Sequence, residues 1–485
     1  MVVDEAIRDL YEPTIGIECH VQLKTKTKLF SGADNDARDK APNTTVSPIC
    51  FGLPGTLPVL NEAAITLAIR AGLALGSEIA PLSRFERKHY FYPDLPKGYQ
   101  ITQLAEPVIL AGKVTIHLSD GTTQEVRIHH AHLEEDAGKL THPVGSSYSL
   151  VDLNRAGTPL IEVVSEADMH SPAAAKAYAR ELYLLMTYAG VTDGDLYHGN
   201  MRFDVNVSVA KKGEPWGTRT ETKNLNSFRS VEKAAEYEIR RQIELLEKGE
   251  RVVQETRGWD EAKQKTVSQR SKENAHDYRY FPDADLPPVR ITPEEIAAVK
   301  AHMPLMPQQY RAAWQGLKVD SSVIQALLAK PALARLVSDV LAASGVSAAT
   351  RVANWCASTI STDLTGAFEI VAHSDKFVEL AVMSEAAEIN STGAKELFNL
   401  LLIEDVSPRQ EAEHRGLLQS NDSAELEAIV DAILADAASQ QAVADIKAGN
   451  MKAIGFLVGM TMKHSKGQAN PAIVTKLIQA KLSSE

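Results

Sequence analysis

The chain has 485 residues, of which 44% are hydrophobic and 24% are charged, and this length exceeds what one hydrophobic core organises. About three domains are therefore expected. The net charge of −12 excludes a protein that coats nucleic acid indiscriminately, because such binding needs a continuous surplus of Lys and Arg. The three cysteines, Cys19, Cys50 and Cys356, are too few and too scattered for a disulfide framework.

The start of the chain, "MVVDEAIRDL", is acidic and lacks the apolar segment of a signal peptide. The longest apolar run, "AIGFLVGM", is far shorter than the roughly 18 residues that a membrane span requires. We therefore expect a cytoplasmic protein without a membrane partner.

The first predicted strand is "TIGIECHVQL", in which apolar and polar residues alternate. Ile17 and Cys19 lie on its apolar face, while Glu18 and His20 lie on the other. Glu18 and His20 would project together, with a spacing suited to holding one cation. The alternative is an amphipathic strand whose polar face is simply solvated.

The stretch "RIHHAHL" predicts another strand, and the acidic run Glu134, Glu135 and Asp136 follows it. Adjacent carboxylates repel one another, and a bound divalent cation would offset this repulsion. If the backbone stays extended, only one of the two glutamates can point at the ion directly, and the other would serve a second ion or the outer shell. Oxygen ligands favour Mg²⁺, while one histidine leaves Mn²⁺ or Zn²⁺ open. A solvated turn is the alternative.

Two aromatic stretches, "ERKHYFYPDLPKGYQ" and "SKENAHDYRYFPDADLPP", resemble one another. Each joins Lys or Arg to an aromatic run that ends before Pro and Asp. Aromatic faces beside cations suit stacked bases and phosphates, so Lys88, Tyr90 and Arg279 are candidate contacts for nucleic acid or a nucleotide. The alternative is that each stretch forms a lid over the core.

A further strand is predicted in "MRFDVNVSVA", with Arg202 and Asp204 on its polar face. "GTRTETKNLNSF" then offers Glu221 before a long amphipathic helix that begins near Phe228. The asparagines of "KNLN" are candidate caps for that helix.

The proline-rich stretch "FPDADLPPVRITPEEI" predicts a domain boundary, and its "TPEE" has the spacing of a helix-capping box. The pattern beyond it is helical, with a second break near "IEDVSPRQ". We therefore predict an α+β chain: a large, mixed, strand-rich domain over residues 1–292, a helical domain over 293–407 and a small helical tail over 408–485.

The end of the tail is positively charged in a negatively charged protein. The last 39 residues contain six lysines and one acidic residue. Three of these lysines, Lys452, Lys463 and Lys466, are candidate contacts for nucleic acid.

Several nucleotide and nucleophile motifs are absent from the sequence. There is no G-x-x-x-x-G-K-[ST], so any use of ATP would not involve a P-loop. There is no G-x-S-x-G, and no cysteine has a convincing histidine partner, so a serine or cysteine nucleophile is not expected.

Taken together, these residues resemble the B subunits of tRNA-dependent amidotransferases, which convert Asp-tRNA(Asn) and Glu-tRNA(Gln) to the amide forms. The resembling segments span nearly the whole chain: "IGIECHVQLKT", "KHYFYPDLPKGYQITQ", "HLEEDAGK", "DLNRAGTPLIEVVSEAD", "KNLNSFRSVEKAAEYEIRRQ", "DYRYFPDADLPP" and "KGQANP". The resemblance implies a cradle-shaped catalytic domain, a helical domain and a tail that holds tRNA. It also implies a heterotrimer with a C subunit and with an A subunit that releases ammonia from glutamine.

The resemblance also implies the chemistry. ATP would phosphorylate the aminoacyl side chain on the tRNA, with Mg²⁺ neutralising charge on the moving phosphoryl group, and ammonia would then displace phosphate. The metal cluster and catalytic residues implied by the resemblance are Glu18, His20, Glu134 and Glu135, with Glu221 as a further metal ligand. Which of the two charged tRNAs is used cannot be read from the sequence.

The chain departs from the family at one place. Many members carry a C-x-C and C-x-x-C zinc pattern where this chain reads "LFSGADNDARDKAPNTTVSPICFG". Only Cys50 remains, with Ser31, Ala33 and Ser47 at the other positions, and one thiolate cannot make a structural zinc site. We therefore predict no zinc there.

Two other function classes are alternatives to the ligase. One is a tRNA-binding scaffold without chemistry, in which the carboxylates form a solvated surface. The other is metal-dependent hydrolysis of a small substrate, which would leave the lysine-rich tail without a purpose.

Overall fold

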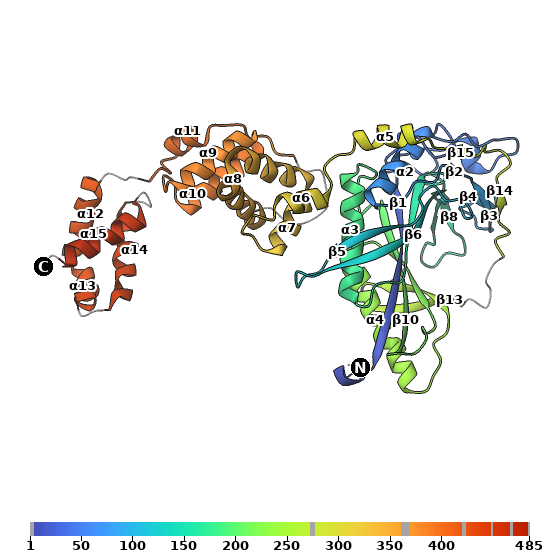
Figure 1. Cartoon of the computed structure of the whole chain (residues 1–485), viewed down its shortest axis with the longest axis horizontal. Helices are drawn as coiled ribbons and strands as arrows, with labels where there is room; N and C mark the ends of the chain where they lie inside the picture. The colour runs from blue at the N-terminus through green and yellow to red at the C-terminus, as the bar shows by residue number, and fades with distance from the viewer. Residues whose placement is uncertain are drawn as a thin grey trace. The chain divides into compact units, whose positions relative to one another are not determined.

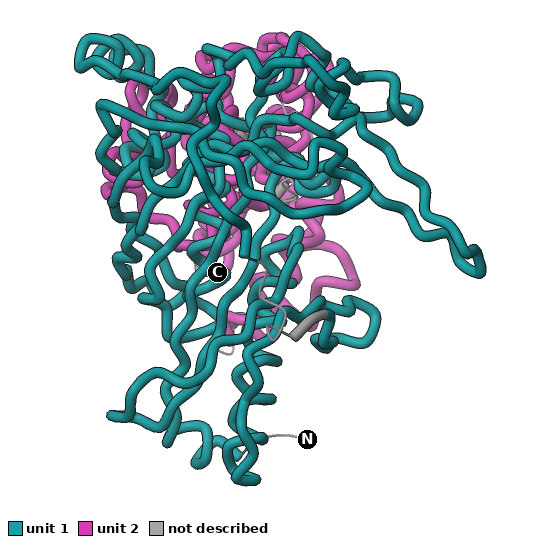
Figure 2. The backbone as a smooth tube through the Cα atoms, turned by 90° about the vertical axis from the view of Figure 1, so that its right-hand side faces the viewer, with its two compact units in different colours: residues 1–309 teal, residues 310–485 magenta. Residues whose placement is uncertain are grey.

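The computed structural model describes residues 4–271, 277–359, 369–419, 423–447, 450–465 and 469–483. The chain divides into two compact units, residues 1–309 and 310–485 (Figure 2). The first unit contains the strands and the second is helical, so the predicted α+β class is confirmed. The predicted boundary at residue 292 lies inside the first unit, and the division into three domains stays a prediction.

The first unit is built on a mixed sheet of eight strands within its described residues. All neighbouring strands are antiparallel except β11 and β12, which are parallel. In spatial order the strands are β13 (Lys265–Ser271), β12 (Glu255–Asp260), β11 (Thr220–Leu225), β10 (Met201–Lys211), β1 (Tyr11–Gln22), β9 (Pro159–Ser165), β6 (Thr123–Glu135) and β5 (Gly112–His117).

The central strand β1 shows why the sheet has one apolar and one polar face. Ile15, Ile17 and Cys19 are almost completely buried, while Glu18 and His20 between them are partly exposed. The predicted alternation is thereby confirmed, and it places Glu18 and His20 on the same face.

Helices α3 (Pro172–Tyr188) and α4 (Phe228–Glu247) pack against each other and against the central strands (Figure 1). The remaining helices of this unit are α1 (Glu5–Arg8), η1 (Pro48–Phe51), α2 (Glu62–Ala74) and α5 (Pro293–Ala301). The predicted caps of α4 were wrong, because Ser227 rather than an asparagine accepts the N–H of Ser230.

In the part of the chain that the structure describes, three small sheets accompany the main sheet. They pair β14 (Phe281–Pro282), β3 (Glu86–His89) and β4 (Tyr99–Thr102); β15 (Val289–Arg290) and β2 (Leu82–Ser83); and β7 (Lys139–Thr141) and β8 (Leu150–Asp152). The two similar aromatic stretches meet in the first of these sheets, where Phe281 lies opposite Arg87 and the His89 N–H donates to Tyr278 O at 2.9 Å. The proline-rich stretch that predicted a domain boundary therefore contributes two short strands, β14 and β15, to the first unit.

The capping box predicted in "TPEE" is confirmed at the start of α5. The Glu295 N–H donates to Thr292 Oγ1 at 3.2 Å, and the Thr292 N–H donates to Glu295 Oε2 at 2.7 Å. Two N–H groups at the helix start are satisfied in this way.

The second unit is helical throughout its described residues, as predicted. Its helices are α6 (Pro307–Ala313, which begins in the first unit), α7 (Ser321–Leu328), α8 (Pro331–Thr359), α9 (Ser374–Glu385), α10 (Ser391–Ile403), α11 (Pro408–His414), α12 (Ser423–Ala435), η3 (Ala437–Ser439), α13 (Gln440–Lys447), η4 (Met451–Ala453), α14 (Ile454–His464) and α15 (Pro471–Ser483). The last helices enclose a core that includes Leu426, Val430, Leu457 and Val474.

One helix has the length and hydropathy of a candidate membrane span, over Pro331–Ser358 of α8. Its backbone leaves helical geometry at Gly345, where φ is 78°, and α8 packs against α7 and α9. Val337 and Val352 on it are fully buried within the protein. Part of this helix is therefore packed within the helical unit.

Candidate metal centre

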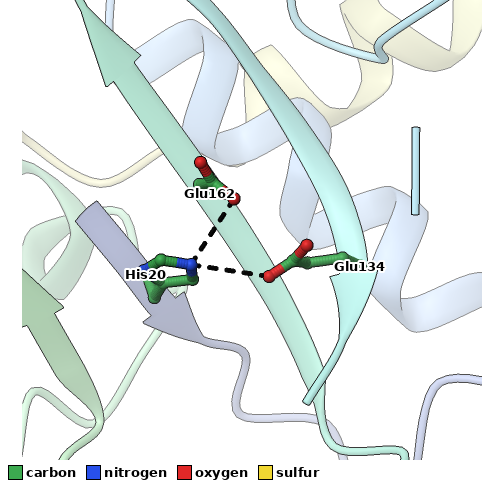
Figure 3. A group of neighbouring side chains, drawn as sticks. All are labelled: His20, Glu134 and Glu162. Carbon is green, nitrogen blue, oxygen red and sulfur yellow. Dashed lines mark ion pairs between the residues drawn. The ribbon is translucent and has the colours of Figure 1, made fainter. Parts of the chain in front are cut away.

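Three adjacent strands of the main sheet bring an imidazole and two carboxylates together. His20 on β1 lies directly opposite Glu162 on β9, and Glu134 comes from β6 on the far side of β9. The His20 Nε2 atom is 3.4 Å from Glu162 Oε2 and 3.6 Å from Glu134 Oε1 (Figure 3). These ligand atoms are close enough together to hold one metal ion. We call these residues the imidazole group.

A second imidazole stands on the other side of the same carboxylates. His132 Nε2 is 3.5 Å from Glu162 Oε2 and 3.7 Å from Glu134 Oε2. Thr102 Oγ1 also donates to Glu134 Oε2, at 3.3 Å. Both glutamates therefore contact both histidines, and we include His132 in the imidazole group.

A β-bulge in β6 puts these side chains on the polar face. Val126 and Ile128 are buried at even positions, whereas Ala131 and Leu133 are buried at odd positions. The register against β9 shifts between Ile128 and His130, so the alternation changes phase at that point. A bulge inserts one unpaired residue and re-aims the side chains that follow it. His132 and Glu134 consequently face Glu162.

A second acidic group lies on the same face, toward β10 and β11. It consists of Glu18, Asp204 and Glu221, whose ligand atoms lie within 4.8 Å of one another. Lys223 Nζ is 2.8 Å from Asp204 Oδ2 and 2.7 Å from Glu221 Oε1. Asn206 Nδ2 donates to Glu18 Oε1 at 3.1 Å. We call Glu18, Asp204, Glu221 and Lys223 the lysine group.

The structure places the metal ligands proposed from the sequence in different groups. His20 and Glu134 belong to the imidazole group, and Glu18 and Glu221 to the lysine group. Glu135 belongs to neither. Its buried carboxylate accepts the N–H of Ile101 at 3.0 Å and forms an ion pair with Lys97. Within the extended strand, Glu134 is thus the one of the two adjacent glutamates that reaches the imidazole group.

Charge controls the state of the imidazole group. Burial by itself would lower the pKa of His20, but the carboxylates of Glu162 and Glu134 outweigh burial and raise it to about 9. The pKa of His132 is also raised, because its hydrogen bond to Glu134 and the charge of Glu162 outweigh burial. The same histidines hold the pKa of Glu162 below its ordinary value, although burial opposes them. A proton on the His20 imidazole therefore offsets part of the carboxylate charge.

In the lysine group, burial raises the pKa of Glu18, and the nearby charges of Glu162 and Glu221 raise it further. Burial would lower the pKa of Lys223, but Asp204 and Glu221 more than offset this and raise it above the ordinary value. The ammonium ion is consequently a permanent counter-charge in this group.

The predicted aromatic contacts lie beside the imidazole group. Rings of Tyr90 and Tyr278 are 6.2 Å apart, and Lys88 Nζ is 5.0 Å from the Tyr278 ring. Among the described residues no carboxylate lies within ion-pair distance of Lys88, yet Glu134 and Glu162 outweigh its burial and raise its pKa. Lys88 therefore presents a positive charge toward the carboxylates without being bound to one.

The other predicted contacts are more exposed. Arg279 lies on the surface in the left-handed backbone region, with φ of 44°. Lys452 and Lys463 in the tail are exposed, whereas Lys466 lies outside the described residues. At the place of the family's zinc pattern, the buried Cys50 Sγ is 3.5 Å from Lys28 Nζ.

Sequence reasoning missed His132 and Glu162, and did not name Asp204 as a ligand. In "HAHLE" the period of two already places His132 on the face of Glu134, so this signal was readable. Glu162 stands alone in the apolar strand "PLIEVVS", and a lone carboxylate in such a strand points to a buried polar site.

The donors of the imidazole group suit a divalent metal ion. Two carboxylates and two imidazoles match Mn²⁺ or Zn²⁺, and the carboxylates with added water match Mg²⁺. Such an ion would displace the protons that now balance the charge, since metal ligands must be deprotonated. The lysine group offers three carboxylates, but an ion entering it would meet the Lys223 ammonium.

Comparison with known proteins identifies the family. Residues 13–297 match the GatB/GatE catalytic domain, and residues 336–482 match the GatB domain. The chain is 46% identical over 484 residues to the B subunit of the aspartyl/glutamyl-tRNA(Asn/Gln) amidotransferase of Alcanivorax borkumensis, covering 97% of this chain and 99% of that protein. It is 45% identical to the corresponding B subunit of Janthinobacterium sp., over 98% of this chain and all of that protein. With both domains matched in order, this chain belongs to the GatB family of tRNA-dependent amidotransferase subunits.

Proposed function

We propose that this chain is the amidating subunit of a glutamine-hydrolysing, tRNA-dependent ligase, acting on Asp-tRNA(Asn), Glu-tRNA(Gln) or both. In this proposal it phosphorylates the side-chain carboxylate of the aminoacyl group at the expense of ATP. It then joins that group to ammonia supplied by a glutaminase A subunit, within a cytoplasmic heterotrimer that also contains a C subunit. The observation that carries the proposal is the convergence of His20, Glu134 and Glu162, with the ammonium of Lys88 close enough to feel both carboxylates.

The reaction has two balanced steps. An oxygen of the aminoacyl carboxylate attacks the γ-phosphorus of ATP, the bond to the β-phosphate oxygen breaks, and ADP leaves with that electron pair. Ammonia then attacks the side-chain carbonyl carbon that bears the new phosphate, phosphate departs with the carbon–oxygen electron pair, and one proton from ammonia ends on phosphate, while the ester to tRNA stays intact. The amide and inorganic phosphate are the products.

The imidazole group would hold the divalent ion through His20, Glu134 and Glu162, and His132 Nε2, at 3.7 Å from Glu134 and 3.5 Å from Glu162, is a further candidate ligand. When bound, Mg²⁺ supplies charge neutralisation for the phosphoryl group during transfer. In the lysine group, the Lys223 ammonium pairs with Asp204 and Glu221 and holds their carboxylates in place. Lys88, which has no bound carboxylate in the described chain, offers its ammonium to an incoming anion.

Aromatic rings near the carboxylates suit the end of an aminoacylated tRNA. The rings of Tyr90 and Tyr278 form one edge-to-face pair, and those of Tyr278 and Tyr280 another, at 6.1 Å. Stacked bases and sugar–phosphate groups bind well to such surfaces when cations are near. Exposed tail lysines such as Lys452 and Lys463 would contact the tRNA backbone farther from the acyl end.

Substitution of Glu134 tests the proposal against the scaffold alternative. We expect Glu134→Gln to lower ATP-dependent phosphorylation of Glu-tRNA or Asp-tRNA by about 10²-fold to 10³-fold, because a charged ligand near the phosphoryl group is lost. The measurement is ³²P transfer to charged tRNA by the assembled enzyme, with tRNA affinity measured in parallel.

A matched control uses the same residue type on the same strand. Glu125 on β6 is exposed and pairs with Lys113 at 2.7 Å, so Glu125→Gln should leave phosphorylation unchanged. If Glu134→Gln retains full phosphorylation with normal tRNA binding, the carboxylates are not part of the chemistry and the scaffold function is correct.

A further inference from the structure

Three histidines form a continuous hydrogen-bonded line from the imidazole group to the surface of the protein. His132 Nδ1 is 3.2 Å from His130 Nε2, and His130 Nδ1 is 2.6 Å from His129 Nδ1. The rings of His130 and His132 are stacked, with centroids 5.2 Å apart and planes 19° apart. His132 is buried, His130 is partly buried and His129 is exposed.

The β6 bulge makes this line possible. In a regular strand His129 would point to the opposite face, but the register shift between Ile128 and His130 moves it out of the alternation. The side chains of His130 and His132 then stand on the same face, two residues apart, where their rings can stack. The sequence "HHAH" supplies the necessary residues at this spacing.

A neutral imidazole has one nitrogen that donates and one that accepts. For His132 to bind a metal ion through Nε2, that nitrogen must lack a proton, so Nδ1 must carry it and needs an acceptor. In the described part of the chain, His130 Nε2 is the hydrogen-bond partner of His132 Nδ1. His130 Nε2 can accept this hydrogen bond only when the proton of the neutral His130 ring is on Nδ1. In that tautomer, His130 Nδ1 would donate to His129 Nδ1, which is 2.6 Å away.

We propose that His130 is a positioning residue for a metal ligand: by accepting a hydrogen bond from His132 Nδ1, it orients His132 so that Nε2 binds a divalent ion between Glu134 and Glu162. His129 completes the line by holding His130 in the required tautomer. The inference rests on the proposed metal centre, and it assigns a role to His129 and His130, which are not themselves ligands of that centre. Partners of this kind orient a metal-binding histidine and raise its basicity.

The chain offers a clean test with Mn²⁺ as the probe. In the full-length protein, His130→Phe keeps an aromatic ring next to His132 but removes the accepting nitrogen. We expect the dissociation constant for Mn²⁺ to rise by about 10-fold to 100-fold. Free Mn²⁺ is measured by electron paramagnetic resonance during titration, and thermal unfolding checks that the variant is folded.

Two further variants separate hydrogen bonding from packing. His130→Gln has a side-chain oxygen that can accept from His132 Nδ1, so it should recover most of the lost affinity. His142→Phe makes the same change at an exposed histidine that bonds Ser149 at 2.7 Å, and it should leave Mn²⁺ binding unchanged.

The outcomes distinguish the inference from the function it rests on. If the wild-type protein binds Mn²⁺ and His130→Phe binds it equally well, the inference is wrong while the metal centre stands. If the wild type binds no Mn²⁺ and Glu134→Gln retains phosphorylation, both are wrong. Should His130→Phe fail to fold, nitrogen NMR of ¹⁵N-histidine-labelled wild type decides: a proton on His132 Nδ1 with Zn²⁺ bound supports the inference, and a proton on Nε2 overturns it.

Discussion

The imidazole group and the lysine group lie on the same face of the same sheet, and both gather carboxylates from neighbouring strands. They differ in the source of the balancing charge. In the imidazole group, Glu134 and Glu162 raise the pKa values of His20 and His132, and an imidazole can bind or release its proton. The ammonium of Lys223 is tethered to the backbone and stays. A carboxylate cluster can exchange its counter-charge for a metal ion only where that counter-charge is free to depart.

The largest expected effect tests the imidazole group. Glu162 contacts both histidines, at 3.4 Å and 3.5 Å, so Glu162→Gln removes the charge that both imidazoles share. We expect phosphorylation of the charged tRNA to fall by about 10²-fold to 10³-fold. Glu221→Gln, in the lysine group, should lower phosphorylation by a smaller factor and leave the Mn²⁺ affinity nearer to the wild-type value. Equal losses of Mn²⁺ affinity would show that both groups hold the ion and would remove the distinction.

A third buried carboxylate extends the comparison to a purely structural case. Glu238 on α4 is fully buried and pairs with Arg241 at 2.8 Å and with Arg257 at 3.0 Å. Glu238→Gln removes the charge that Arg241 and Arg257 share, but both guanidinium groups stay within ion-pair distance of Glu255, so we expect a destabilisation below about 3 kcal/mol. The measurement is denaturant unfolding, and Mn²⁺ affinity should not change in the folded variant.

The pH dependence of the same residue follows from its pKa. Burial would raise the pKa of Glu238, but its hydrogen bonds and ion pairs with Arg241, Thr266 and Arg257 outweigh burial and lower it. A carboxyl group whose folded pKa is depressed stabilises the protein above its unfolded pKa and loses that contribution as the pH falls. Glu238→Gln should therefore flatten the loss of stability below a pH of about 4.5. If Glu238→Gln loses stability at low pH as steeply as the wild type, other carboxylates dominate acid unfolding.

The smallest expected effect concerns the ammonium of Lys223. Lys223→Met removes the ammonium from between Asp204 and Glu221. Because about a third of the Lys223 side chain is exposed, we expect a loss of only about 1 kcal/mol. Added Mg²⁺ or Mn²⁺ should raise the melting temperature of this variant more than that of the wild type, since the group would then accept an ion. Equal shifts would show that Lys223 does not compete with cations.

Much of the fold could be predicted because its signals are local. The alternation in "TIGIECHVQL", the capping box at Thr292 and the helical periodicity of the second unit all depend on neighbours within a few residues. The predicted boundary near residue 292 was less secure, because strand pairing of residues 281–290 with β3 and β2 is a long-range contact. The caps of α4 failed for a local reason, since Ser227 rather than Asn226 stands at the first position outside the helix.

The sequence by itself determined that Glu18 and His20 share a strand face, that Glu134 and Glu135 must point apart in an extended backbone, and that the chain is mixed first and helical afterwards. Only the tertiary structure decided which carboxylates meet. Glu162 reaches His20 through strand order, and Glu135 finds Lys97 instead. The physical reason is that period-two alternation sets the face of each residue, whereas strand register and one bulge set its neighbours across the sheet.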